Sequence, residues 1–150
     1  MLIYRIALEK YASALTASGW AARWNPNGRY VLYAAQSRAL ACLENLVHRS
    51  GEGLSNRFKV MVIDLPDDLP VTDADLARLP TDWQAGSQYP ACQAHGENWL
   101  RAGVTAVLRV PSALIPSEFN YLMSVYHPDF ARIKLVGMED FLFDTRFKGP

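Results

Sequence analysis

The sequence predicts a single α+β domain, in which a mixed β-sheet is flanked by helices. Its 150 residues, half of them hydrophobic, suit one domain that buries roughly 70% of the surface its unfolded chain exposes. Apolar runs of strand length alternate with segments whose apolar residues recur at helical spacing. We find no repeat and no low-complexity segment, so one domain is expected to span residues 1–150.

The N-terminal third predicts a strand, a helix and a turn between two strands. Residues 1–5 have strand character, and the apolar spacing over residues 7–15 predicts an amphipathic helix that ends at Gly19. The next turn signal is Asn25-Pro26-Asn27-Gly28, between Arg23-Trp24 and the β-rich Tyr30-Val31-Leu32-Tyr33. This pattern predicts two strands joined by a turn, with Gly28 at positive φ.

The middle of the chain predicts a second helix and a buried strand. Ser37 is the expected N-cap of a helix with one apolar stripe, and residues 58–65 form an almost unbroken apolar run that ends at Pro66. Such a run is typical of a strand covered on both faces, so we expect the centre of the sheet there. The stripe consists of Ala39, Leu40, Leu43, Leu46 and Val47.

Residues 66–90 are rich in Asp, Pro, Thr and Ala and predict a surface excursion, with Thr72 as the cap of a short helix over residues 75–79. Alternating apolar residues over 104–110 predict a strand that Pro111 ends. At the C-terminus, Ile133, Leu135, Phe141, Phe143 and Phe147 lie on either side of Gly137-Met138-Glu139-Asp140, which predicts a closing hairpin.

Charge and cysteine content exclude several classes of function. The 15 basic and 15 acidic residues cancel, which disfavours polyanion binding, an RNA-cleaving toxin and membrane-surface binding. Cys42 and Cys92 lie far apart, outside any CxxC spacing, which favours free thiols in a reducing compartment over a disulfide. The chain has no apolar run of membrane-spanning length, and a cytoplasmic location is expected.

Four residues near the turn and on the second helix are candidates for chemistry. Arg23 offers a planar fork of donors for phosphate oxygens, while Trp24 and Tyr33 offer aromatic faces. Glu44 lies at the flank of the apolar stripe, where it pairs with a cation such as Arg5 or Arg23 or is kept for a substrate. Ordinary alternatives remain open, namely a surface arginine, core aromatic residues and a solvated glutamate.

Other common site types find no support in the sequence. Ser112 lies at the predicted strand end, but Pro111-Ser112-Ala113 lacks the GxSxG turn of hydrolases, so we expect a hydrogen-bond donor. The three histidines lack metal-ligand spacing, so no metal is expected. GxGxxG and GxxxxGK[ST] are both absent, which disfavours Rossmann and P-loop nucleotide sites.

Nine short motifs follow one another in a characteristic order and spacing along nearly the whole chain. They are Tyr4-Arg5, Arg23-Trp24-Asn25 with Gly28, Val31-Leu32-Tyr33-Ala34, Leu40-Ala41-Cys42-Leu43-Glu44 with His48, Gly96-Glu97-Asn98-Trp99, Val110-Pro111-Ser112-Ala113, Asn120-Tyr121-Leu122, His127-Pro128-Asp129-Phe130 and Phe143-Asp144-Thr145-Arg146. Their order and spacing resemble the RES domain, a family of bacterial toxins named for an Arg, a Glu and a Ser. Two places depart from the family pattern, Ser124-Val125-Tyr126 before His127-Pro128 and Gly96-Glu97-Asn98 before Trp99.

The resemblance implies a fold similar to ADP-ribosyltransferase toxins and an activity that degrades NAD by hydrolysis or phosphorolysis of the nicotinamide–ribose bond. NAD is then the substrate, and no metal is needed. An Xre-family helix-turn-helix antitoxin is the implied partner, in a complex that contains a homo-oligomer of the toxin. The implied catalytic residues are Arg23, Tyr33 and Glu44, and the implied substrate-binding residues are Arg5, Trp24, Asn25, Tyr33, Ser112 and Asn120.

Two alternatives compete with NAD degradation. A mono-ADP-ribosyltransferase would use the same pocket and a protein side chain as acceptor. A non-catalytic interaction module would present the arginines and aromatic residues as a partner surface and would never turn over NAD.

Overall fold

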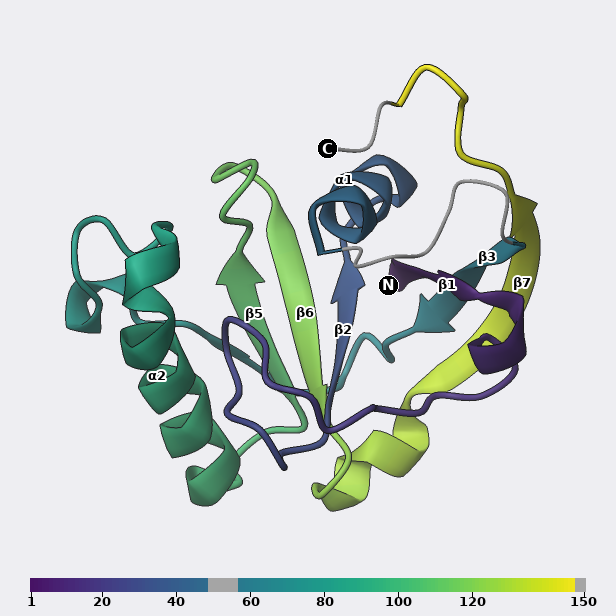
Figure 1. Ribbon diagram of the computed structural model, residues 1–150. Helices are drawn as coiled ribbons and strands as arrows, with labels where there is room; N and C mark the ends of the chain where they lie inside the picture. The colour runs from purple at the N-terminus through teal and green to yellow at the C-terminus, as the bar shows by residue number, and fades with distance from the viewer. Residues whose placement is uncertain (49–56, 148–150) are drawn as a thin grey trace.

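The computed structural model describes residues 1–48 and 57–147, which form one seven-stranded sheet with two α-helices (Figure 1). The strand order is β4-β5-β6-β2-β1-β3-β7, and among these neighbours β4 and β5 are parallel while the others are antiparallel. The predicted α+β class with a mixed sheet is therefore confirmed. The strands are β1 (Leu2–Leu8), β2 (Val31–Ala35), β3 (Phe58–Asp64), β4 (Val71–Asp73), β5 (Val107–Pro111), β6 (Phe119–Ser124) and β7 (Lys134–Phe141), and the helices are α1 (Arg38–His48) and α2 (Tyr89–Ala102).

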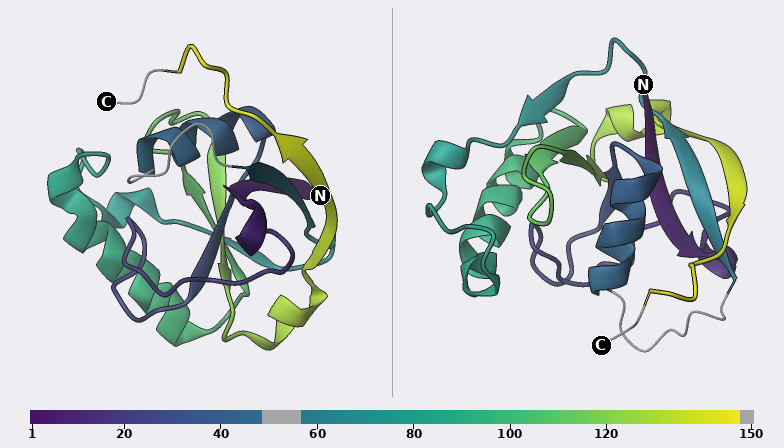
Figure 2. Two further views of the ribbon diagram at one scale, coloured as in Figure 1. Left: turned by 45° about the vertical axis from the view of Figure 1, so that its right-hand side comes forward. Right: turned by 90° about the horizontal axis from the view of Figure 1, so that it is seen from above.

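The sheet consists of two parts that meet loosely between β1 and β2. These strands pair at one position, Tyr4 with Ala35, whereas β1 pairs with β3 along its whole length. One core cluster contains buried residues of both parts, such as Ile3 and Ile63 on one side and Leu32 and Val107 on the other. Helix α1 packs against β1 and β2, and α2 lies beside β5 and β6 (Figures 1 and 2).

Several local predictions are confirmed. The amide of Leu40 donates to the Ser37 hydroxyl (3.1 Å), so Ser37 caps α1. Gly28 has φ +85°, as its turn requires. Cys42 and Cys92 are not joined in a disulfide. Ser112 directly follows the last residue of β5.

Three predictions for the first half of the chain are wrong. The segment predicted as a helix over residues 7–15 completes β1 and forms the short 3-10 helix η1 (Glu9–Tyr11), because Ala7, Ala12 and Leu15 reach the core without an α-helix, while Tyr11 is 59% exposed. Arg23-Trp24 forms no strand, since the turn there closes with an isolated bridge between Ala22 and Asn25. The sheet order places β3 next to the edge strand β7, so the apolar run of β3 reflects cover on both faces rather than a central position.

Further corrections concern the second half of the chain. Thr72 lies in β4 and bonds Thr105, while Asp75 caps the 3-10 helix η2 (Leu76–Arg78). The expected C-terminal hairpin is the single strand β7, because Gly137 has no positive φ and the strand continues through it. Sequence reasoning did not identify α2, although Pro90 in its first turn and the left-handed Gly103 at its C-cap are ordinary helix-end signals. The remaining 3-10 helices are η3 (Gly86–Gln88) and η4 (Pro128–Arg132).

Candidate active site

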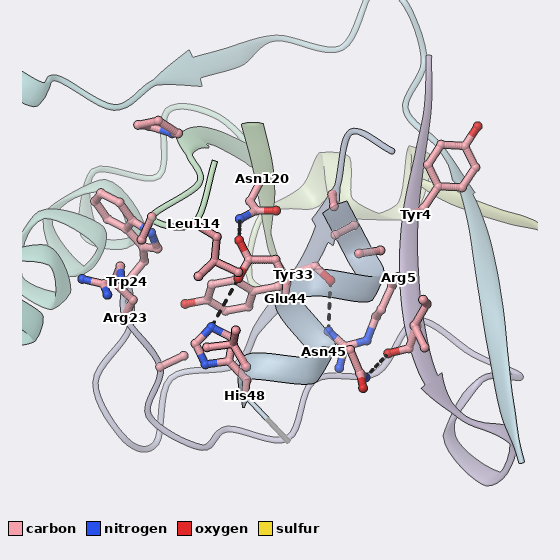
Figure 3. Close-up of a pocket in the computed structure, with 18 of the residues that line it drawn as sticks. Tyr4, Arg5, Arg23, Trp24, Tyr33, Glu44, Asn45, His48, Leu114 and Asn120 are labelled. Atoms are coloured by element: carbon pink, nitrogen blue, oxygen red, sulfur yellow. Dashed lines mark hydrogen bonds and ion pairs between the residues drawn. The ribbon is translucent and has the colours of Figure 1, made fainter. Parts of the chain in front are cut away.

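A cavity of about 430 Å³ lies where β1 and β2 separate, beside α1 (Figure 3). Strand β1 contributes Tyr4 to Ile6, strand β2 contributes Tyr33 to Ala35, and α1 contributes Glu44 and His48. The cavity is within the usual size of small-molecule sites. Of the predicted site residues, Arg5, Arg23, Trp24, Tyr33, Glu44 and Asn120 line it, whereas Asn25 and Ser112 do not.

Glu44 carries a carboxylate that three side chains hold in place. Ser112 Oγ donates to Oε1 (2.8 Å), and Asn120 Nδ2 donates to the same oxygen (2.7 Å). His48 Nε2 lies 3.3 Å from Oε2, one helical turn away on α1. Burial raises the pKa of Glu44, but hydrogen bonds from His48, Asn120 and Ser112 outweigh it and leave the pKa below its ordinary value. The carboxylate is thus charged at neutral pH.

Ser112 acts on Glu44 from behind the cavity wall. It is fully buried, and its hydroxyl oxygen accepts from the amides of Leu114 (3.0 Å) and Ile115 (3.2 Å) while it donates to Glu44. With both amides on its oxygen, the hydroxyl hydrogen has one direction left, toward the carboxylate. The hydroxyl therefore fixes Glu44. The expected pairing of Glu44 with Arg5 or Arg23 is not found among the described residues.

Arg5 brings a positive charge to the cavity without an acidic partner among the described residues. Its Nη1 donates to the carbonyl oxygen of Tyr33 (3.0 Å), across the gap between β1 and β2. Desolvation by burial lowers the pKa of Arg5, yet a guanidinium still stays protonated in proteins. A cation held by a single neutral acceptor favours the entry of an anion.

Arg23 and Trp24 lie on the side of the cavity away from Arg5 (Figure 3). Arg23 donates to three backbone carbonyls, and its guanidinium lies 4.5 Å from the ring centroid of Tyr89. Trp24 is 4% exposed and packs on Trp83 at 5.6 Å between ring centroids, so most of its indole belongs to the core. Burial raises the pKa of the Cys92 thiol, and the Arg23 guanidinium beside it opposes that rise.

Asn25 and Tyr33 form a buried pair beside the cavity. The Tyr33 hydroxyl donates to Asn25 Oδ1 (2.5 Å), and burial raises the pKa of Tyr33. The Asn25 amide nitrogen donates to the carbonyls of Trp20, Pro26 and Arg29. Because its side chain is fully engaged within the loop, Asn25 orients Tyr33, whose ring lines the cavity. The binding of substrate by Asn25 itself stays a prediction.

Helix α2 fixes the position of this loop. A Cβ added at Gly96 would overlap the carbonyl oxygen of Trp24, so only glycine permits this close approach of helix and loop. Gln93 Nε2 also donates to the carbonyl of Ala22 (2.9 Å). The Arg23-Trp24 segment is therefore held from α2, an element that sequence reasoning did not find.

Several lining residues were not among the predicted site residues. His48 was visible as the residue one turn after Glu44, and Asn45 is its neighbour on α1. Gly86 and Tyr89 carry no sequence signal, because they reach the cavity only through the packing of the segment before α2. The described residues include no group of three or more His, Cys, Asp or Glu that could hold a metal ion. Nor do they include a helix long and apolar enough to cross a membrane.

Comparison with known proteins gives the family. The RES-domain family model matches residues 2–145. A protein named Prs ADP-ribosylating toxin from Sphingobium sp. strain YBL2 is 38% identical over 83% of this chain and 78% of its own. A protein named Toxin Res from Photorhabdus laumondii is 34% identical over 97% of this chain and 96% of its own.

A solved structure has the same fold. In the crystal structure of the M. tuberculosis MbcT–MbcA toxin–antitoxin complex, one chain aligns with a TM-score of 0.74 and 23% identity. The alignment covers 94% of this chain and 84% of that one. At this identity the likeness establishes the fold. With the match along residues 2–145 and relatives above 30% identity, the chain belongs to the RES-domain family.

Proposed function

We propose that this protein is the toxin of a bacterial toxin–antitoxin pair and that it degrades NAD by cleaving the nicotinamide–ribose bond. The observation that carries the proposal is the presence of two opposite charges in one cavity, the carboxylate of Glu44 and the guanidinium of Arg5. NAD has complementary features, because its ribose develops positive charge during cleavage and its pyrophosphate is an anion. The cytoplasm, where the NAD pool lies, is the expected site of action.

Glu44 stabilises the transition state in this mechanism. As the bond from ribose C1 to the nicotinamide nitrogen breaks, its electron pair leaves with nicotinamide, and the sugar becomes oxocarbenium-like. A carboxylate held by Ser112 and Asn120 needs no reorganisation to face that charge. Nicotinamide leaves as a neutral molecule, so no strong acid is required. Water then adds to ribose C1 and loses a proton, which gives ADP-ribose. If inorganic phosphate adds instead, the product is ADP-ribose phosphorylated at that carbon.

The other lining residues position the dinucleotide. Arg5 binds the pyrophosphate, because its guanidinium has donors to spare and faces the cavity from β1. Tyr33 packs its ring against nicotinamide or ribose. Asn120 lines the cavity as well as bonding Glu44, so its carbonyl oxygen can accept from a ribose hydroxyl.

Product identification tests the proposal directly. The purified protein is incubated with NAD, with and without phosphate, and the products are separated by chromatography and identified by mass spectrometry. We expect free nicotinamide in both cases, with ADP-ribose in the absence of phosphate. Intact NAD at high enzyme concentration would contradict the proposal and favour a non-catalytic interaction module.

A second function, mono-ADP-ribosylation of a protein, is supported by the name of the Sphingobium relative, an ADP-ribosylating toxin. It uses the same cavity with a protein side chain in place of water. Incubating the protein with NAD labelled on the adenine and with cell lysate separates the two. Label on a protein band favours transfer, whereas label on small products alone favours degradation.

A partner follows from the same reasoning. A protein that depletes NAD in its own cell must be restrained, and the structurally similar MbcT chain occurs in a complex with an antitoxin. We therefore propose an antitoxin partner of the Xre helix-turn-helix family, with more than one copy of the toxin in the complex. Co-expression with a candidate Xre-family antitoxin, followed by purification and light scattering, tests both the partner and the stoichiometry.

A further inference from the structure

The guanidinium of Arg23 sits at the convergence of three consecutive carbonyl groups. Nη1 donates to the carbonyl oxygens of Trp83 (2.8 Å) and Ala85 (3.3 Å), and Nη2 donates to that of Gln84 (2.8 Å). Three adjacent carbonyl dipoles aimed at one point repel one another unless a cation lies between them. This segment has backbone hydrogen bonds of its own, from Trp83 N to Pro80 O and from Ala85 N to Asp82 O, and Arg23 adds bonds to three of its carbonyls.

This segment leads directly into a wall of the cavity. Gly86 and Tyr89, which follow the three carbonyls, both line the cavity. Arg23 also makes a cation–π contact with this wall, with its guanidinium carbon 4.5 Å from the ring centroid of Tyr89. One side chain therefore fixes both the backbone before Gly86 and the ring of Tyr89.

Arg5 differs from Arg23 in these respects. Among the residues that the structure describes, Arg5 donates to one neutral acceptor and lies over no aromatic ring, whereas Arg23 donates to three backbone carbonyls and lies against the ring of Tyr89. An anion binds most strongly to the cation whose donors are least engaged by the protein itself. The two arginines of the cavity are therefore suited to different tasks.

We propose that Arg23 is a positioning residue, which shapes the Gly86–Tyr89 wall of the cavity, while Arg5 contacts the substrate pyrophosphate. This inference rests on the proposed function. It assigns to Arg23 a role that its residue type does not suggest, since a forked cation beside a turn predicts a phosphate clamp.

Two substrates separate the roles of the two arginines. We compare kcat/KM for NAD and for nicotinamide riboside, which has the scissile bond but no phosphate, in Arg23→Ala, Arg5→Ala and the control Arg78→Ala, whose side chain is 80% exposed. For Arg23→Ala we expect kcat/KM to fall by the same factor on both substrates, about 10- to 100-fold, because the displaced cavity wall affects either substrate. For Arg5→Ala the loss on NAD should exceed that on the riboside by about tenfold.

Amide hydrogen exchange gives a second, activity-independent readout. Arg23→Ala should speed exchange over residues 83–89, Arg23→Lys should restore part of the protection because lysine keeps three donors, and Arg5→Ala should leave that segment unchanged. Unchanged exchange in Arg23→Ala, or an Arg23→Ala defect that disappears with nicotinamide riboside, would overturn the inference. A wild-type protein that cleaves neither substrate contradicts the proposed function, while the exchange experiment still tests the role of Arg23.

Discussion

The two edges of β1 differ, and the difference separates stability from function. Toward β3, all seven residues of β1 are paired. Toward β2, pairing is limited to Tyr4 and Ala35, and the Arg5 side chain bonds the Tyr33 carbonyl across the gap. A continuous ladder leaves no room for a ligand, whereas two diverging strands expose side chains and a cavity. We therefore expect the closed edge to contribute most to stability, while the open edge holds the cavity of the candidate site.

The largest expected effect is on the closed edge. Ile63 on β3 is fully buried opposite Ile3, so Ile63→Ala should lower the free energy of unfolding by about 3–4 kcal/mol. Urea denaturation measures this, and NAD turnover at low temperature should change little. Leu142→Ala is the matched control, because Leu142 is 78% exposed and its truncation should cost under about 0.5 kcal/mol. Equal effects of the two variants would contradict the assignment of stability to this edge.

On the open edge, Glu44→Gln removes the charge and keeps an acceptor for Ser112 and Asn120. We expect kcat for NAD to fall about 100-fold or more, equivalent to about 2.7 kcal/mol of transition-state stabilisation. Circular dichroism should show an intact fold. Glu9→Gln, at a half-exposed glutamate outside the cavity, should retain wild-type kcat. A fully active Glu44→Gln enzyme would remove Glu44 from the mechanism.

The pH dependence sharpens the same assignment. Because the folded pKa of Glu44 lies below its ordinary value of 4.5, its contribution to stability is complete above 4.5 and is lost as pH falls through the lower folded value. The carboxylate should stay charged, and kcat unaffected by its protonation, down to that range. Carbon-detected NMR titration of Glu44 measures the midpoint, and a midpoint above 4.5 would contradict the hydrogen-bonded geometry.

A smaller effect is expected from Arg5→Lys, which keeps the charge but loses the fork. NAD should bind about tenfold more weakly, about 1.4 kcal/mol, because a lysine cannot bridge two phosphate oxygens and the Tyr33 carbonyl together. Calorimetry in the Glu44→Gln background, where turnover is expected to be about 100-fold slower, measures the binding of NAD. Unchanged affinity would show that the pyrophosphate lies elsewhere.

The smallest effect concerns the helix that carries Glu44. Ser37→Ala removes the N-cap of α1 and should cost about 1 kcal/mol of stability, measured by thermal unfolding. Ser117→Ala, at an exposed serine, serves as the control and should be neutral. A loss of activity larger than the loss of stability would mean that the start of α1 also positions Glu44.

Local features of this fold could be predicted from sequence where a short-range rule dominates. The cap at Ser37, the positive φ of Gly28 and the buried strand β3 each depend on a few neighbouring residues. Glu44 was identifiable because its flank position on an amphipathic helix leaves a carboxylate half desolvated. Predictions failed where tertiary packing determines the local structure. Residues 7–15 have apolar residues at helical spacing, yet the segment continues β1 and packs on the core without forming an α-helix.

Local sequence rules could not predict the hydrogen-bond partners of the site residues. The resemblance implied that Ser112 and Asn120 bind substrate, but their bonds to Glu44 join β5, β6 and α1 and depend on the register of the sheet. The three carbonyls that hold Arg23 come from a segment about sixty residues away, before a helix that sequence reasoning had not identified. Such contacts follow from topology, which periodicity does not encode.

The missing side chain at Gly96 couples the middle of α2 to the cavity, although Gly96 does not line it. Any replacement there must push α2 and the Trp24 carbonyl apart, which shifts Arg23 while every cavity-lining side chain keeps its identity. Substitutions that weaken this toxin, whether natural or engineered, can therefore lie outside the cavity lining. Position 96 is accordingly a place to weaken the protein in graded steps without altering its chemistry.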